Sequence, residues 1–240
     1  DAFRFTLSDT VTVEEFNEGF EISADFYIID GKAQKVMWCQ LNKFQVNDST
    51  QVIYQSVIPP VLSDKASASL NEIANKIAKA YEVDNSPLLI QAMINGDDVR
   101  VIEFSARLGG GAKYKTIQNG TGLNVLRANL ESMLGEVPEV TIHYTGKCYS
   151  RCHIYLTGGK FVAIEGLDEL VKDGTIKEFV LTRPFGVNVN SPASSSDRVA
   201  SVFIQANDQL ELDRKVKTAI STLKVLDENG NDILKRDMYL

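Results

Sequence analysis

The fold of this chain is decided by residues 88–111, which read LLIQAMINGDDVRVIEFSARLGGG. Polar and apolar residues alternate on both sides of a turn-forming segment, residues 95–98 (Asn-Gly-Asp-Asp). Alternation with a period of two around such a turn is typical of two antiparallel strands joined as a hairpin. The sequence therefore predicts antiparallel β-structure at its centre, with a three-residue loop at residues 96–98.

The register of this hairpin separates two faces. It pairs Ile90 with Phe104 on one face, together with Ala92 and Ile102, and that face is entirely apolar. The opposite face pairs Gln91 with Glu103 and Leu89 with Ser105, and it continues to Arg107. A slip of one residue would bury Glu103, so the polarity of the residues and the register agree.

The polar face has the chemistry of a hard-cation site beside an anion clamp. A carboxylate and an amide oxygen, from Glu103 and Gln91, suit Mg²⁺, which takes most of its remaining ligands from phosphates and water. The guanidinium of Arg107 suits a carboxylate or phosphoryl oxygen. The alternative is an ordinary half-exposed hairpin whose outer face is polar because it meets water.

Further elements follow from periodicity and capping signals. We expect strands at residues 11–16, at 21–29 and 35–46 around an Asp-Gly turn, and at 141–143, 149–156 and 199–205. We expect helices at residues 63–81, at 121–134 with Gly135 after the last turn, and at 208–223 behind Asp208. A stop of the type Gly-x-x-Pro at residues 135–138 is the best candidate domain boundary.

Composition restricts the class of protein. The chain has 240 residues, 44% of them hydrophobic and 24% charged, which is ordinary for a globular protein. Its 25 basic and 32 acidic residues give a net charge of −7, which argues against nucleic acid and against an anionic membrane as a partner. Three cysteines and no apolar stretch long enough to span a membrane lead us to expect a cytoplasmic protein.

The hairpin resembles the metal-binding hairpin of the ATP-grasp superfamily, whose pattern is a polar ligand on one strand and Glu-x-Asn-x-Arg on the next. It is most similar to the branches of carbamoyl phosphate synthetase, phosphoribosylglycinamide synthetase and L-amino acid ligase. The resemblance implies that Gln91, Glu103 and Ser105 are metal ligands and that Arg107 stabilises an acyl-phosphate. Ser105 stands where the family usually has Asn, which weakens the metal shell on one side.

A second match lies at residues 13–21 (Val-Glu-Glu-Phe-Asn-Glu-Gly-Phe-Glu), which resemble the hinge strand of the same superfamily. The resemblance implies that the backbone of Glu14, Glu15 and Phe16 binds the adenine edge and that Glu21 binds the ribose hydroxyls. Strand-edge N–H and C=O groups suit the adjacent donor and acceptor of adenine, and a carboxylate accepts from two hydroxyls. The alternative is a solvated, acidic strand end.

The resemblance predicts an α+β fold in two parts. Residues 1–137 would form the ATP-grasp C-terminal lobe, a mostly antiparallel sheet with flanking helices, and residues 138–240 a small α/β domain. In the superfamily a smaller lobe with phosphate-binding lysines precedes the hinge strand, but only ten residues precede Val11 here, and the chain begins at Asp1. We therefore expect the C-terminal portion of a larger enzyme, inactive when isolated.

The implied parent enzyme is a carboxylate–amine ligase. It would use ATP with Mg²⁺ or Mn²⁺ to activate a small carboxylate as an acyl-phosphate, which an amine substrate then attacks, and a homodimer is possible. Two competing hypotheses are a non-catalytic module that binds a nucleotide or another small ligand, and a plain interaction domain without a ligand.

Other candidate groups have simpler explanations. Cys148, Cys152 and His153 invite a zinc interpretation, but strand alternation places both cysteines on one face and His153 on the other, which predicts core cysteines. Lys43 and Lys113 are the remaining basic residues near the proposed site, and we expect both to be ordinary surface lysines.

Overall fold

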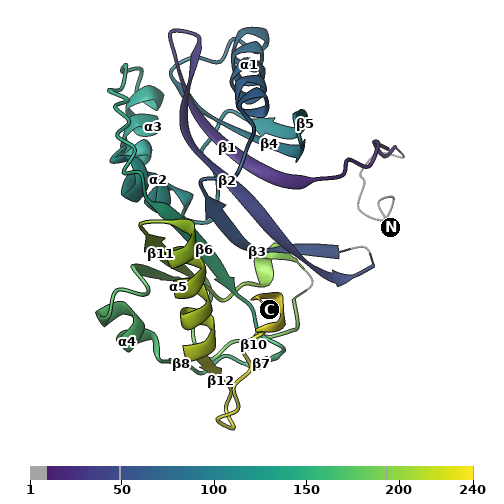
Figure 1. Ribbon diagram of the computed structural model, residues 1–240, viewed down its shortest axis with the longest axis vertical. Coiled ribbons are helices and arrows are strands. Elements are labelled where there is room, and N and C mark those ends of the chain that lie inside the picture. The colour runs from purple at the N-terminus through teal and green to yellow at the C-terminus, as the bar shows by residue number, and fades with distance from the viewer. Residues whose placement is uncertain (1–9, 49, 193, 240) are drawn as a thin grey trace.

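The computed structural model describes residues 10–48, 50–192 and 194–239. Its centre is an eight-stranded sheet in the order β5-β4-β1-β2-β3-β6-β11-β9, in which every pair of neighbours is antiparallel. The strands of this sheet are β1 (Phe20–Ile29), β2 (Lys32–Asn47), β3 (Thr50–Ile58), β4 (Ser86–Asn95), β5 (Asp98–Ser105), β6 (Cys148–Ile154), β9 (Glu178–Leu181) and β11 (Ala200–Ala206). Figure 1 shows this sheet running through both halves of the chain, which meet where β3 pairs with β6.

In the described residues, five α-helices pack on the sheet or at its end, and two small sheets complete the C-terminal half. The helices are α1 (Asp64–Ala80), α2 (Lys113–Thr121), α3 (Val125–Met133), α4 (Leu167–Lys172) and α5 (Gln209–Thr222). The small sheets pair β7 (Gly159–Lys160) with β10 (Asn188–Val189) and β8 (Ala163–Glu165) with β12 (Lys224–Leu226). This mixture of helices and antiparallel strands confirms the predicted α+β class.

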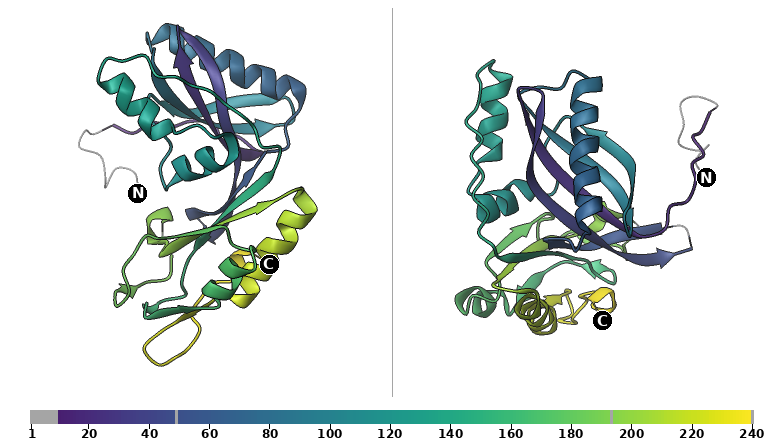
Figure 2. Two further views of the ribbon diagram at one scale, coloured as in Figure 1. Left: turned by 90° about the vertical axis from the view of Figure 1, so that its left-hand side faces the viewer. Right: turned by 45° about the horizontal axis from the view of Figure 1, so that its top comes forward.

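The two faces of the sheet carry different layers. In the N-terminal half, α1 covers the face formed by Ile22, Ala24 and Phe26 of β1, whereas α2 and α3 pack on the opposite face (Figure 2). In the C-terminal half, α5 covers the face of β6 that contains Cys152 and Ile154. The three cysteines are free, and Cys152 lies in this core with no exposed surface, as strand alternation predicts.

Helix α1 was located correctly from its sequence. It begins after Ser63, whose hydroxyl accepts a hydrogen bond from the backbone N–H of Ala66 at 3.1 Å, and it buries Ala66, Leu70, Ala74 and Ala78. The period of these residues and the N-cap signal agree, so local sequence alone determines the element.

The helix predicted over residues 121–134 is present as α3, but its predicted start at Thr121 is wrong. Thr121 ends α2, and Gly122 follows it with a positive φ of 75° that terminates the helix. A new helix, α3, begins after Asn124, whose side chain accepts from the backbone N–H of Arg127 at 3.1 Å. The glycine breaks the helix because it adopts the left-handed conformation that other residues avoid.

A strand predicted at residues 141–143 is also absent, because these residues form an extended connection instead. The strands predicted around residues 149–156 and 199–205 are present as β6 and β11. The proposed boundary between residues 137 and 138 falls in the connection between α3 and β6. The large sheet continues across it, and the division into two domains remains a prediction.

Candidate functional site

One face of the central strands is polar although it is buried. Glu21, Ser23 and Asp25 alternate along β1 with apolar residues of the α1 side, and each is less than 10% exposed. Gln91 of β4 lies opposite Ser23, and Arg151 and His153 of β6 lie farther along the same face. Buried polar groups need hydrogen-bond or ion-pair partners. The partners of these side chains therefore show which groups remain available to bind a ligand.

The pairing of the metal candidates follows the predicted register. Gln91 lies opposite Glu103, and Leu89 lies opposite Ser105, so all three predicted ligands lie on β4 and β5 close to one another. Glu103 is exposed, whereas Gln91 and Ser105 are half-buried.

The predicted loop and one predicted pair of the hairpin are wrong. Asn95 pairs with Asp98 around a two-residue turn, and Ala92 pairs with Val101 instead of Ile102. A β-bulge between Gln91 and Ala92 takes up the extra residue, Ile102, which is 47% exposed. The bulge places Glu103 on the polar face beside Gln91 because it inverts the alternation of β5 at that point.

Glu21 connects the hairpin to its neighbours on the sheet. The amide N–H of Gln91 donates to Glu21 Oε1 at 2.5 Å, and Lys43 of β2 forms an ion pair with Glu21 Oε2. Because the amide nitrogen of Gln91 faces Glu21, its carbonyl oxygen remains available as an acceptor. Lys43 is exposed, as expected of a surface lysine, and its ion pair with the buried Glu21 also makes it part of the polar cluster.

A cleft of about 990 Å³ adjoins this cluster. Glu14, Glu15 and Phe16 form one wall, and Glu21 and Lys43 lie on its other side, together with Tyr54, Met93 and Ile102. The predicted hinge residues and Glu21 are thus brought to one cavity. The strand predicted at residues 11–16 is wrong, since these residues are extended without pairing to another described strand and β1 begins at Phe20.

Arg107 follows the end of β5 and is exposed. Its Nη1 donates to the carbonyl oxygen of Leu108 at 2.8 Å, and no described residue forms an ion pair with it. The three glycines at residues 109–111 then lead into α2. Gly111 and Ala112 have positive φ angles of 65° and 61°, so the chain turns sharply over the polar face.

Lys113 is the functional candidate that the sequence analysis misjudged. It is 4% exposed, its Nζ donates to Ser23 Oγ at 2.7 Å, and it forms an ion pair with Asp25. Burial raises the pKa of Asp25 above its ordinary value, against the opposite effects of Lys113 and Arg151. No signal in the local sequence distinguishes Lys113 from a surface lysine, because its partners are almost 90 residues away.

The donor set fits Mg²⁺ or Mn²⁺ held largely by a nucleotide. In the described ranges of the chain, no group of three or more His, Cys, Asp or Glu side chains is arranged to hold a metal ion. One carboxylate with an amide oxygen and a hydroxyl is enough for a magnesium ion that takes its other ligands from phosphates and water.

Comparison with known proteins gives a sequence match in the C-terminal half. A family model described as L-amino acid ligase C-terminal domain 2 matches residues 153–226. No curated protein matches the chain.

Solved structures share the fold over most of the chain. Phosphoribosylglycinamide synthetase from Anaerococcus prevotii has a TM-score of 0.76 at 17% identity, over 94% of this chain and 58% of that one. L-amino acid ligase from Bacillus licheniformis has a TM-score of 0.77 at 18% identity, over 89% and 55%. The biotin carboxylase domain of Hydrogenobacter thermophilus 2-oxoglutarate carboxylase, in complex with MgADP, ADP and bicarbonate, has a TM-score of 0.64 at 12% identity, over 90% and 46%.

The chain therefore has the fold of these solved structures, which is the fold that the ATP-grasp resemblance predicted. Residues 153–226 are similar to the second C-terminal domain of L-amino acid ligases. The chain spans 58% and 55% of the lengths of the first two structures. Among the described helices, none has both the length and the apolar character that crossing a membrane requires.

Proposed function

We propose that the chain is the C-terminal part of an ATP-dependent carboxylate–amine ligase. The observation that carries this proposal is the pairing of Glu103 with Gln91 on a polar sheet face that adjoins the large cleft. In this scheme the γ-phosphoryl group of ATP passes to a carboxylate, and an amine displaces the phosphate from the acyl-phosphate to form an amide bond. Each step develops negative charge, which cationic groups must stabilise.

The cleft would hold the nucleotide. The backbone of Glu14, Glu15 and Phe16 offers N–H and C=O groups to adenine, and Glu21 can accept from the ribose hydroxyls. Phe16 is 88% exposed along this wall, so its ring is available to cover the base. The Hydrogenobacter relative, a complex with MgADP, supports a nucleotide with magnesium as the ligand.

The end of the hairpin would hold the metal ion and the reacting groups. Gln91, Glu103 and Ser105 provide the oxygen ligands, and a Mg²⁺ or Mn²⁺ ion bound there would neutralise phosphate charge. Arg107, which forms no ion pair with the described residues, would stabilise the acyl-phosphate through its planar guanidinium.

The chain spans 58% and 55% of its first two structural relatives, and we propose that the activity of the whole protein involves further residues. We infer that the isolated chain binds nucleotide without turning it over. A cytoplasmic location agrees with three free cysteines, and a homodimer is compatible with the proposal.

Ser105 favours a second candidate, a non-catalytic module that binds a nucleotide or another small ligand. A hydroxyl is a poorer ligand for Mg²⁺ than the amide oxygen usual at this position, so the metal site would be weaker than in an active ligase. The two candidates differ in whether nucleotide binding depends on the metal.

Calorimetric titration of ATP tests the proposal, with Mg²⁺ and with the metal removed by chelation. We expect Glu103→Gln to weaken binding about tenfold or more in Mg²⁺, since it removes the only carboxylate among the metal candidates, and to have little effect without metal. Glu165→Gln, an exposed glutamate on β8, is the control and should behave like the wild type. Binding with the same dependence on Mg²⁺ in all three proteins would contradict the metal assignment and favour the non-catalytic module.

A further inference from the structure

Two arginines converge on one point beside the glycine loop. Arg151 lies on β6, and Arg198 lies two residues before β11, the neighbouring strand. A methyl group added to Gly111 would be 3.4 Å from Arg151 Nη1 and 3.7 Å from Arg198 Nη1. No side chain occupies this point because residue 111 is glycine, and Gly111 itself is exposed.

The charge of Arg151 is buried without an anionic partner. Arg151 is 7% exposed, its Nη1 donates to the carbonyl oxygen of Gly111, and its Nε has no hydrogen-bond partner. The nearby carboxylate, Asp25, is taken by Lys113. A buried guanidinium that is not paired with an anion is unfavourable, and an oxyanion bound beside it would offset that cost.

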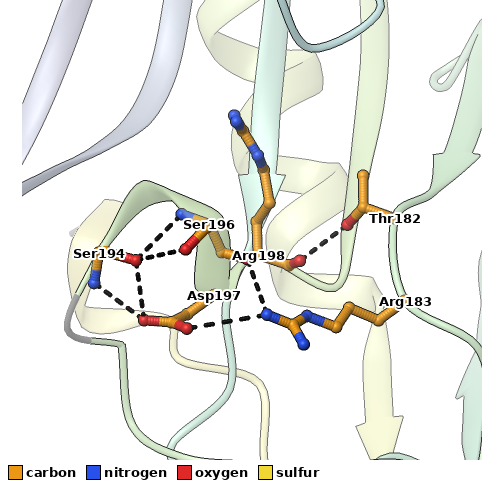
Figure 3. Close-up of polar contacts among 6 residues, drawn as sticks. All are labelled: Thr182, Arg183, Ser194, Ser196, Asp197 and Arg198. Atoms are coloured by element: carbon orange, nitrogen blue, oxygen red, sulfur yellow. Dashed lines mark hydrogen bonds and ion pairs between the residues drawn. The ribbon is translucent and has the colours of Figure 1, made fainter.

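Arg198 is held by its main chain while its side chain extends to the site. Thr182 Oγ1 donates to the carbonyl oxygen of Arg198 at 2.7 Å, and Asp197 faces Arg183 at 3.9 Å. Figure 3 shows the Arg198 side chain pointing away from this network of Ser194, Asp197 and Arg183. In the described parts of the chain, neither Arg198 nor Arg151 has a carboxylate within ion-pair distance.

His153 adds a neutral neighbour, not a third charge. Burial, with the charges of Arg151 and Arg198, lowers the pKa of His153 well below its ordinary value. The Nδ1 atom lies 2.8 Å from Ser201 Oγ, and Nε2 lies 3.4 Å from Arg198 Nη1, so the neutral ring donates to the serine and accepts from the arginine. This arrangement orients Arg198 without neutralising it.

We propose that Arg151 and Arg198 bind an oxyanion, a carboxylate or a phosphate, in the space beside Gly111. Two guanidinium groups directed at one point provide the charge-assisted hydrogen bonds that such groups prefer. Helix α2 begins two residues later without a side-chain cap, so its N-terminal dipole adds positive potential nearby. The site stands on this geometry alone, and only its assignment to a substrate carboxylate or released phosphate rests on the proposed function.

Titration of the full chain with inorganic phosphate and with sodium acetate, followed by the amide resonances of residues 109–112, tests the proposal. Both titrations are done without nucleotide and without Mg²⁺, so the result does not depend on the nucleotide cleft. We expect at least one of the two anions to shift these resonances at millimolar concentration. Phosphate alone would identify the ligand as a phosphate, and acetate alone as a carboxylate, while both would show that the shared oxyanion is recognised.

Arg198→Gln is the decisive variant because Arg198 is only half-buried and its loss leaves the core intact. We expect anion binding about tenfold or more weaker than in the wild type. Arg214→Gln removes the same charge from an exposed position on α5, across the sheet, and should bind like the wild type. Gly111→Ala places a methyl group at the convergence point and should also weaken binding.

Two results would overturn the proposal. One is a wild-type chain whose glycine-loop resonances respond to neither anion, and the other is equal binding by Arg198→Gln and Arg214→Gln. If the ligase proposal is wrong but this one is right, the affinity for ATP will not depend on Mg²⁺ or on Glu103. The affinity for the anion will still depend on Arg198.

Discussion

At the scale of single residues, the least expected feature is the buried ion pair between Lys113 and Asp25. The pair lies under the glycine loop, where a Cβ at Gly109 would be 3.1 Å from Asp25 Oδ1. Lys113 therefore links α2 to β1 and fixes the position of the loop that contains Gly111. A surface position, which local sequence suggested, would leave Asp25 buried without a partner.

Lys113→Met is expected to reduce the free energy of unfolding by about 3 to 5 kcal/mol at neutral pH, since it leaves a buried carboxylate unpaired. Burial already raises the pKa of Asp25 above 3.8, and without Lys113 it rises further. The folded variant then binds more protons than the unfolded one, so its stability relative to wild type falls as pH increases above this value. Arg151, the other cation near Asp25, is present in both proteins.

Urea unfolding between about pH 4 and pH 7 measures this effect. Lys115→Met is the matched control, because Lys115 pairs with Glu178 in a half-exposed position where an ion pair contributes about 1 kcal/mol or less. A deficit for Lys113→Met that is independent of pH, or as small as that of the control, would show that Asp25 does not depend on Lys113.

At the scale of elements, helix α1 and the hairpin of β4 and β5 are joined by polar side chains at the start of the helix. Ser63 caps α1 and also donates from its hydroxyl to Asp97 Oδ1, in the turn between β4 and β5, at 2.7 Å. Lys65 of α1 lies 3.4 Å from the same carboxylate. The start of the helix thus supports the turn that sets the register of Gln91 and Glu103.

Ser63→Ala is expected to lower the free energy of unfolding by about 1 kcal/mol, the usual contribution of an N-cap. It should also accelerate amide hydrogen exchange in the turn at residues 95–98, because the link to Asp97 is lost. Asp208→Ala removes the N-cap of α5, whose side chain accepts from the N–H of Glu211, and serves as the control. Equal exchange rates in this turn for the two variants would rule out the proposed support.

At the scale of the whole molecule, the single large sheet unites the two halves of the chain. Residues 55–58 of β3 pair with residues 149–152 of β6, and Tyr149 packs in the same cluster as Tyr27 and Met37 of the N-terminal half. Separating the halves would break these hydrogen bonds and expose this apolar surface. The sheet therefore resists independent unfolding of either half.

We expect urea unfolding of the full chain to be one cooperative transition. Trp38, the only tryptophan, is 3% exposed on β2 and reports on the N-terminal half by fluorescence, while far-ultraviolet circular dichroism reports on the whole chain. The two curves should coincide. Midpoints that differ between the two probes would show that the halves unfold separately, as the predicted two-domain division allows.

Local sequence determined much of this protein. The period of Leu70 and Ala74, the cap at Ser63 and the alternation around Gln91 and Glu103 each depend on residues a few positions apart, so α1 and the pairing of Gln91 with Glu103 were predictable. The fold was predicted from the resemblance of the hinge and hairpin segments, and from their order in the chain, to those of ATP-grasp proteins.

Only the tertiary structure decided the rest, because its causes are contacts between distant residues. Asp25 and Lys113 form a buried ion pair although they are 88 positions apart in the sequence. Arg151 and Arg198 both lie beside Gly111 only because β6 and β11 are neighbours in the sheet. Local sequence also gives no signal for the bulge at Ile102. The bulge arises because the two-residue turn at Gly96 and the pairing of Gln91 with Glu103 leave one extra residue on β5. Strand pairing and the burial of charge depend on residues that are far apart in the sequence. They place these side chains where they can interact, which no short stretch of sequence specifies.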